Sequence, residues 1–202
     1  MANKDVPHGF NLWGPCLRAR LYAVPTAPTI NICVNDIVAN DNAGILSGKL
    51  GLVLSVYDAA IIPATPGDAI KLLGPVQACF DENMDPIQYI AATRVGDGTV
   101  AGYVLIADHP SQQLEAQGDT AFADADLNLN YEITSAVLCA PNSDTGLSTQ
   151  EIAIAGAAVT TTIPLRLMGQ SHPDEDDHSL VGCRMVCQIN PDCHYYGAAV
   201  ML

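Results

Sequence analysis

Four side chains able to bind zinc stand near the end of the sequence, at Cys183, Cys187, Cys193 and His194. Structural zinc sites usually pair their thiolates as Cys-x₂₋₄-Cys units, whereas the intervals here are three residues and then five. In a strand, Cys183 and Cys187 would lie roughly 13 Å apart, while two ligands of one zinc ion lie within about 4 Å. We therefore expect both cysteines to be buried, reduced core residues without a metal.

Carboxylates and imidazoles form a second group between His172 and His178. A calcium loop needs a glycine and a distal glutamate at fixed spacing, which this run lacks, so it is typical of a solvated loop between strands. Asp108, His109 and Ser111 have the residue types of a hydrolase triad, but their crowding in a proline-terminated turn gives no reason for a positioned base. The sequence therefore predicts no enzyme: no catalytic residue, no cofactor and no metal.

The composition excludes several classes of partner. The chain has 202 residues, 49% of them hydrophobic, and a formal net charge of −14 from 8 Lys+Arg and 22 Asp+Glu. Such a chain can bury a core, and its acidity repels phosphate, which argues against a nucleic-acid partner. No stretch approaches the roughly 18 apolar residues of a membrane span, and no charged-then-apolar leader opens the sequence. We expect no membrane partner, synthesis in the cytoplasm, and seven reduced cysteines.

A period-two alternation of apolar and polar residues predicts the elements that would position these groups. It is clearest at residues 127–133, 163–167 and 181–189. Further strands are expected at residues 50–57, 69–73, 88–93, 100–107 and 151–155, and only residues 120–126 look helical. Short strands separated by turns every ten residues or so indicate a mainly β protein, built as a compact antiparallel barrel or jelly-roll-like sandwich.

The first thirty residues differ from the rest of the chain. Residues 1–50 hold four of the eight basic residues, and prolines stand at positions 7, 15, 25 and 28. Because proline disfavours both helix and central strand, we expect residues 1–30 to form an extended arm that gains order from a partner, with residues 31–202 as the β-rich body. The alternative is that this segment folds along its own domain. Aromatic and basic side chains are common interface anchors, and the arm offers Phe10, Trp13, Arg18 and Arg20 as candidate contacts.

The opening Met1-Ala-Asn-Lys-Asp-Val-Pro-His-Gly-Phe10 resembles that of the capsid decoration, or cement, proteins of tailed bacteriophages, which tend to begin Met-Ala-Asn-x-Asp-x-Pro-x-Gly-Phe. Further similar pieces follow in the same order and cover most of the chain after residue 66. They are Gly67–Leu72, Tyr103–Asp108, Leu114–Gln117, Asp126–Asn130, Asn142–Ser148, Ile163–Gly169, Pro173-Asp174 and Val186–Asn190. Residues 11–60 match poorly, so we expect a remodelled or inserted segment there, including residues 31–60 of the body.

The resemblance implies a structural protein on the outer face of a capsid. Its members contact neighbouring major capsid proteins and sit as oligomers at local symmetry axes, so we expect a homo-oligomer, with a trimer favoured over a dimer. The resemblance brings no catalytic residues with it.

Three alternatives stay open at this point. The chain is also compatible with another virion component, such as a head fibre base or a tail protein. A small-ligand or carbohydrate-binding β domain is disfavoured by a 5% aromatic content with one tryptophan. An enzyme would need a convergent polar site that the sequence does not reveal.

Overall fold

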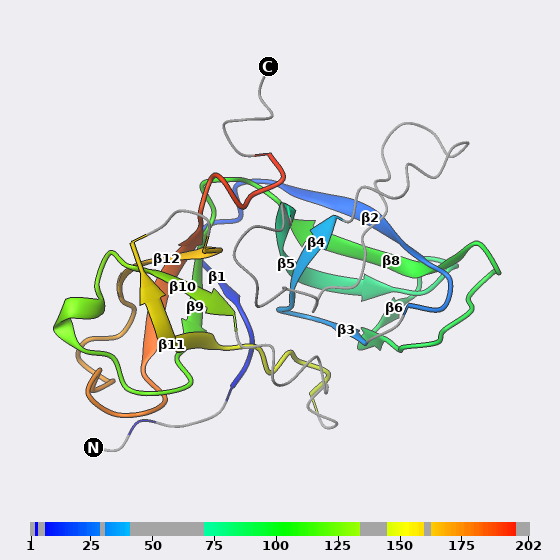
Figure 1. The fold of residues 1–202 in the computed structure, drawn as a ribbon. Coiled ribbons are helices and arrows are strands. Elements are labelled where there is room, and N and C mark those ends of the chain that lie inside the picture. The colour runs from blue at the N-terminus through cyan, green and yellow to red at the C-terminus, as the bar shows by residue number, and fades with distance from the viewer. Residues whose placement is uncertain are drawn as a thin grey trace.

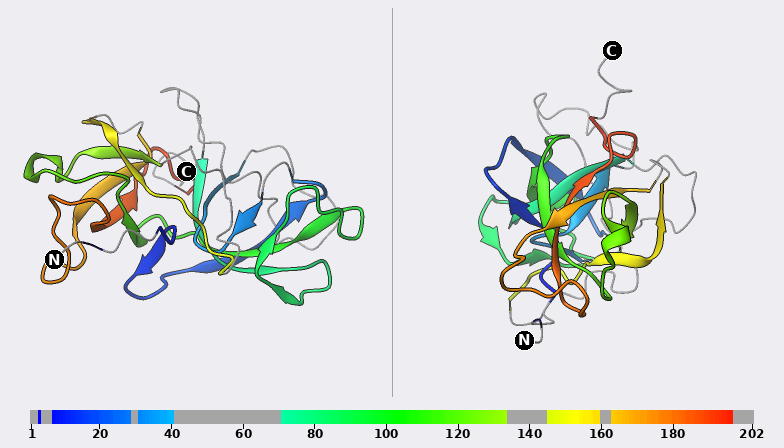
Figure 2. Two further views of the ribbon diagram at one scale, coloured as in Figure 1. Left: turned by 90° about the horizontal axis from the view of Figure 1, so that it is seen from below. Right: turned by 90° about the vertical axis from the view of Figure 1, so that its left-hand side faces the viewer.

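The computed structural model describes residues 3, 7–28, 31–40, 71–133, 145–159 and 163–196. This part of the chain is mainly β with antiparallel sheets, as the sequence predicts, and its sheets form no closed barrel. Its one helical element is a short 3₁₀ turn at Asp124–Asp126, inside the segment that looks helical in the sequence. The strands gather into two lobes that lie side by side (Figures 1 and 2).

Lobe I is a six-stranded sheet with the order β1-β9-β13-β12-β10-β11. Its strands are β1 (Asn11–Trp13), β9 (Gln113–Gln117), β13 (Arg184–Ile189), β12 (Leu165–Gln170), β10 (Asn130–Ile133) and β11 (Ile152–Ala158). All neighbours in this sheet are antiparallel.

Lobe II is a five-stranded sheet with the order β2-β8-β5-β4, in which β6 also pairs with β5. Its strands are β2 (Ala19–Pro25), β8 (Val100–Ala107), β5 (Lys71–Phe80), β4 (Ile37–Asn40) and β6 (Pro86–Ile87). A separate pair of short strands, β3 (Ile32–Cys33) and β7 (Tyr89–Ile90), packs beside it, with Ile32 and Ile90 in the same hydrophobic cluster as β2 and β8.

The two lobes share a buried junction. Ile37 and Leu72 belong to strands of lobe II but pack in the hydrophobic cluster of lobe I, together with Phe10. Backbone hydrogen bonds reinforce this contact: the Phe10 amide donates to the Asn35 carbonyl at 2.8 Å, and the Ser148 amide donates to the Val34 carbonyl at 2.9 Å. The lobes are therefore joined by core packing as well as by the covalent chain.

The predicted alternation is confirmed over residues 183–189, although the strand begins only at Arg184 and Val181, expected on the buried face, is 45% exposed. Along β13 and the residue before it, the side chains that face the core are at most 4% exposed, and they are Cys183, Met185, Cys187 and Ile189. Strand β8 has the predicted bounds, and Leu165 and Leu167 are fully buried while Arg166 is exposed. The predicted strand at residues 127–133 begins later, at Asn130, because Leu127 and Asn128 form a turn after the 3₁₀ element, with Asn128 at φ +66°.

The N-terminal segment differs from the expected arm in the residues that the structure describes. Residues 11–13 pair with β9 and residues 19–25 pair with β8, so the segment supplies one strand to each lobe. The prolines do not prevent this because positions 7 and 15 fall outside these strands, and position 25 ends β2 on an edge of its sheet. Tyr22 and Val24 are at most 1% exposed, which makes the segment part of the core. The described residues of this segment therefore follow the alternative stated above, in which the segment folds along its own domain.

Several predicted features lie wholly or partly outside the described residues. The strand expected at residues 50–57 lies wholly outside them, and the one expected at residues 69–73 is described only from Lys71, where β5 begins. Of the segment expected to be remodelled or inserted, the described residues 31–40 form β3 and β4, both paired within the body.

Candidate functional site

The four candidate contact residues do not form one surface. Phe10 is 0% exposed and packs in the core of lobe I, so its side chain is not accessible to a partner in this conformation. The cause is local: Gly9, at φ +73°, turns the chain so that the Phe10 amide meets the Asn35 carbonyl and the ring points into the core. Trp13 lies on lobe I, whereas Arg18 and Arg20 lie against lobe II.

Trp13 is half-buried at the end of β1, an edge strand of lobe I. Its ring meets the ring of His172 edge-on, with 5.7 Å between the centroids. His172 in turn lies 2.9 Å, Nε2 to Oε2, from the carboxylate of Glu115 on β9. An aromatic ring, an imidazole and a carboxylate therefore stand together at this edge of the sheet.

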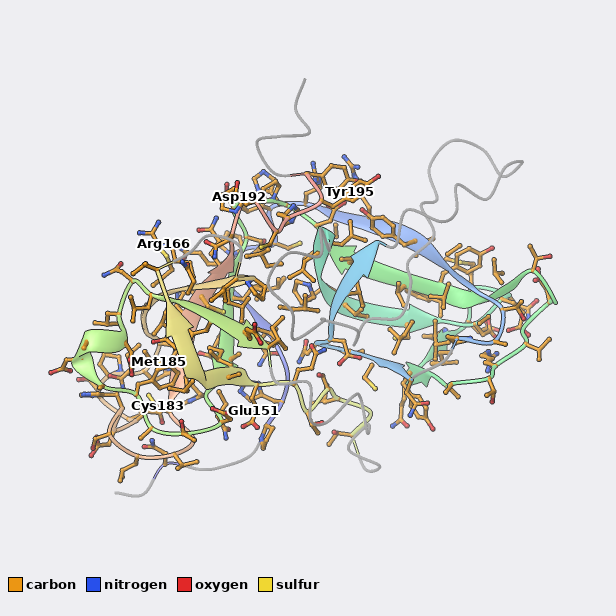
Figure 3. All side chains as sticks on the ribbon, in the orientation of Figure 1. Glu151, Arg166, Cys183, Met185, Asp192 and Tyr195 are labelled. Atoms are coloured by element: carbon orange, nitrogen blue, oxygen red, sulfur yellow. The ribbon has the colours of Figure 1, made fainter. Side chains whose placement is uncertain are left out.

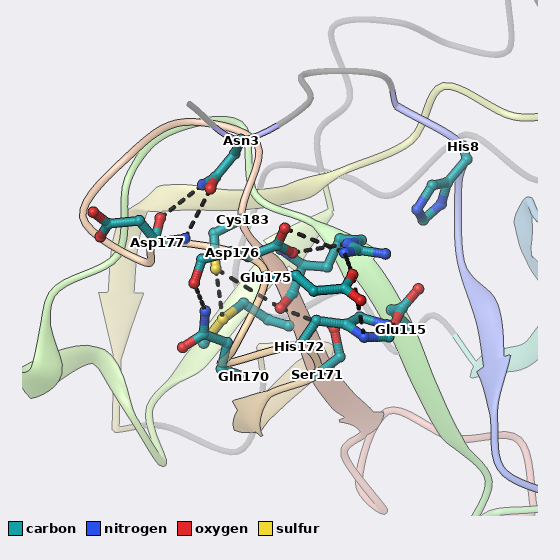
Figure 4. Close-up of polar contacts among 12 residues, drawn as sticks. Asn3, His8, Glu115, Gln170, Ser171, His172, Glu175, Asp176, Asp177 and Cys183 are labelled. Atoms are coloured by element: carbon teal, nitrogen blue, oxygen red, sulfur yellow. Dashed lines mark hydrogen bonds and ion pairs between the residues drawn. The ribbon is translucent and has the colours of Figure 1, made fainter. Parts of the chain in front are cut away.

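The acidic run after His172 is ordered by one arginine. Arg184 donates from Nε to Asp176 at 2.8 Å and from Nη2 to Glu175 at 3.0 Å (Figure 4). Burial alone would raise the pKa of Asp176, but hydrogen bonds from the side chain and backbone of Arg184 lower it overall. Asn3 also holds this loop through the backbone of Asp177, at 2.7 and 2.8 Å. A shallow hollow of about 360 Å³ lies along the loop.

Arg18 and Arg20 surround the buried carboxylate of Asp108, which the sequence presented only as a member of a triad-like group with His109 and Ser111. Asp108 is 0% exposed, and Arg18 donates to it from Nε at 2.7 Å, while the Tyr22 hydroxyl donates to its other oxygen. Arg20 lies 3.6 Å from the same carboxylate and donates to the Tyr196 hydroxyl at 3.0 Å. Burial, and then the hydrogen bond to Asp108, raises the pKa of Tyr22.

His194 lies beside this group on the segment that follows β13. It forms an isolated bridge with Leu72 at the start of β5, and its Nδ1 accepts a hydrogen bond from the Tyr196 amide at 3.0 Å. Burial lowers the pKa of His194 to about 4. Asp108 favours the protonated form, and Arg18 and His109 oppose it, but burial is the largest effect.

This histidine is expected to make the protein sensitive to acid. Between pH 6.5 and about 4, the unfolded chain protonates His194 while the folded chain keeps it neutral, so the free energy of unfolding falls as the pH falls. The loss amounts to up to about 3 kcal/mol. Urea denaturation at several pH values measures it. In His194→Gln, the fall of the unfolding free energy between pH 6.5 and about 4 is expected to be smaller by this amount, whereas in the control His178→Gln it stays the same. An unchanged pH dependence in His194→Gln would show that His194 does not cause the acid sensitivity.

The burial predicted for Cys183 and Cys187 is confirmed, since both are 0% exposed (Figure 3 labels Cys183). Burial raises the pKa of Cys183 to about 11 and raises that of Cys187 further, which keeps both thiols protonated at neutral pH. Within the described ranges, no group of three or more His, Cys, Asp or Glu side chains is placed to hold a metal ion.

Apart from its place beside His109 and Ser111, one signal in the sequence marks the position of Asp108. It follows the apolar run of β8 directly, at the point where the chain leaves lobe II for lobe I. Its partners could not be found this way, because Arg18, Arg20 and Tyr22 are separated from it by 86 to 90 residues in sequence.

Together the described residues define an antiparallel, two-lobed β protein with an aromatic edge on lobe I and an ionic cluster around the buried Asp108 on lobe II. In comparisons with known proteins, no family model, no curated protein and no solved structure matches the chain. Among the described residues, no helix is both long and apolar enough to cross a membrane.

Proposed function

We propose that the protein is a structural component of a tailed-phage virion that decorates the outer face of the capsid and bridges neighbouring major capsid proteins. The observation that carries the proposal is the ordered resemblance described above, from the opening segment to residue 190. We also propose that it acts as a homo-oligomer, with a trimer favoured over a dimer, and that the complete body has the barrel or jelly-roll-like form that the spacing of its short strands and turns predicts.

The resembling pieces supply the framework of both lobes. Residues 103–108 form most of β8 and end at the buried Asp108, and residues 114–117 form most of β9. Residues 163–169 and 186–190 contain most of β12 and β13, which pair with each other in lobe I. A resemblance placed on core strands supports a shared fold, whereas one confined to surface loops would not.

The charge distribution is compatible with an outer-face location. A formal net charge of −14 disfavours contact with packaged nucleic acid, and exposed carboxylates such as Asp124 and Glu175 crowd the loops of lobe I. A shell surface that accepts this protein should therefore offer neutral or basic groups.

The surface that we propose contacts the capsid is the exposed connection between β1 and β2, which begins after Trp13. Residues 14–17 are all exposed, and Leu17 keeps 51% of its surface accessible. Arg20 keeps 44% of its side chain accessible, although its guanidinium is already engaged by Tyr196. A partly buried tryptophan beside an exposed leucine is a typical anchor of a protein interface.

Replacing Trp13 tests this contact. We expect Trp13→Ala to bind capsids stripped of the protein roughly 30-fold more weakly than the unaltered chain, which is the size of an interface hot spot. Co-sedimentation at increasing protein concentration measures the binding, after circular dichroism shows that the variant is folded. Val95→Ala is the matched control, because Val95 is 60% exposed on lobe II, far along the chain from this connection. Equal binding by Trp13→Ala and the unaltered chain would place the contact elsewhere.

A further inference from the structure

The last described residues, 191–196, follow β13 and lie on lobe II as a docked segment (Figure 3 labels Tyr195 on it). Two backbone hydrogen bonds hold this segment: the Leu72 amide donates to the Cys193 carbonyl, and the Tyr195 amide donates to the Leu72 carbonyl, both at 2.8 Å. Through them His194 forms a parallel bridge with Leu72 on β5. The segment is therefore held on the lobe by one short pairing.

Two adjacent tyrosines complete the docking. Tyr195 and Tyr196 pack against the hydrophobic cluster of lobe II, and their rings meet edge-on with 4.9 Å between the centroids. The guanidinium carbons of Arg18 and Arg20 lie 4.8 and 5.0 Å from the centroid of the Tyr196 ring, within the range of a cation–π contact. Because arginine remains protonated in acid, these two contacts by themselves give the docking no pH dependence.

His194, in the middle of the docked segment, is the residue on which acid acts. It is 1% exposed, and its Nδ1 accepts a hydrogen bond from the Tyr196 amide at 3.0 Å. The neutral imidazole therefore carries its proton on Nε2, which is buried and forms no hydrogen bond of ordinary geometry to the described residues. A second proton would have to enter at Nδ1, in the place that the Tyr196 amide already occupies.

The surroundings of His194 also disfavour a positive charge. Burial is the largest influence and lowers the pKa of His194 to about 4. The Leu73 backbone on β5 and Asp108, which directly follows β8, favour the protonated form, whereas Arg18 and His109 oppose it. Asp108 already accepts a hydrogen bond from Arg18 at 2.7 Å, so its charge is largely balanced before His194 is protonated.

We propose that His194 is an acid-sensitive latch: the neutral imidazole holds residues 191–196 on lobe II, and protonation releases them while both sheets stay folded. An imidazolium has two N–H donors and no acceptor, so it cannot keep the bond from the Tyr196 amide. It would also leave a charge buried without a free partner, and undocking removes this penalty by moving His194 into water. The latch acts in the isolated chain and does not depend on attachment to a capsid.

Hydrogen exchange between pH 7 and pH 4 tests the latch. His194 titrates near pH 6.5 when it is in water and near pH 4 when it is docked, so the equilibrium constant for undocking is expected to rise about a hundredfold over this range. After correction for the pH dependence of intrinsic exchange, the protection of the Tyr195 and Tyr196 amides should fall by this factor. At every pH, these amides should also exchange at least tenfold faster than the central amides of β13, because only the segment has to open.

Two variants separate the latch from a general effect of acid. In His194→Gln, we expect the protection of the segment to stay within about threefold between pH 7 and pH 4, since no imidazole is left to protonate. His178→Gln is the matched control, because His178 pairs with Asp124 at 3.0 Å on lobe I, and it should keep the full hundredfold fall. A fall of the same size in His194→Gln would overturn the proposal.

The unaltered chain provides a second test, which does not require that a variant folds. If the amides of the docked segment and those of β13 showed equal protection at every pH, the segment would open only when the whole protein unfolds. That result would also overturn the latch.

Discussion

Cys187→Asp is expected to prevent folding at neutral pH. Cys187 is 0% exposed at the centre of the lobe I core, and its neighbours in that cluster are aliphatic, aromatic or sulfur-containing side chains. A carboxyl group there costs about 2–7 kcal/mol even when it is neutral, because it has no hydrogen-bonding partner, and more when it is charged. Because the free energy of unfolding of a typical protein is about 5–15 kcal/mol, such a loss would remove much or all of it. Circular dichroism and urea denaturation measure the outcome.

The isosteric control separates polarity from packing at this position. Cys187→Val stays apolar and is expected to fold with a loss below about 1.5 kcal/mol. Stoichiometric zinc in the purified, unaltered protein, together with equal stability losses for the valine and aspartate variants, would show that Cys187 acts as a ligand and not as a core residue.

Gly9→Ala is expected to destabilise the junction between the lobes by about 2–5 kcal/mol. Gly9 has φ +73°, where a side chain costs about 1–2 kcal/mol. An added Cβ would also lie 2.5 Å from Ser148 Cβ and 2.6 Å from the Asn35 carbonyl oxygen, both in segments that join the lobes. Overpacking of this kind costs about a further 1–3 kcal/mol. Thermal and urea unfolding of the variant measure the combined cost of the backbone conformation and the steric overlap.

Gly14→Ala is the matched control for the junction. Gly14 has a similar φ of +83°, but an added Cβ would meet no atom within 4 Å. It therefore carries the backbone cost without the collision, and we expect Gly9→Ala to be the more destabilising of the two by at least about 1 kcal/mol. Equal losses at the two positions would mean that the junction adapts to the added methyl group.

The fold could be predicted from the sequence wherever one face of a strand is buried and the other is not. Apolar and polar side chains alternate over residues 183–189 because lobe I buries one face of β13. The predicted bounds of the strand at residues 100–107 agree with those of β8. Strand β5 extends seven residues beyond the predicted end at Leu73, and the Gly74-Pro75 pair that favours a turn lies inside it. Pairing with β4 and β8 on its two sides overrides that local signal.

The candidate site could be predicted only in part, because its residues are positioned by contacts distant in sequence. Arg18 and Arg20 were singled out by charge in a segment rich in proline, but local sequence could not show that a buried Asp108 engages them. For Phe10, nothing local in the sequence indicates that its amide meets the Asn35 carbonyl and that its ring packs in the core of lobe I. Arg18 and Arg20 are positioned by the pairing of β2 with β8, and Phe10 is positioned by its contact with Asn35 and the core of lobe I.

The most direct test of decoration is electron microscopy of virions at low resolution, with this protein present and with it removed. The proposal predicts additional density on the outer face of the capsid, repeated at symmetry axes between neighbouring major capsid proteins, that disappears in particles lacking the protein. Density confined to the portal, tail or head fibres would favour another virion component. No difference between the two particles at any position would contradict a structural role in the virion.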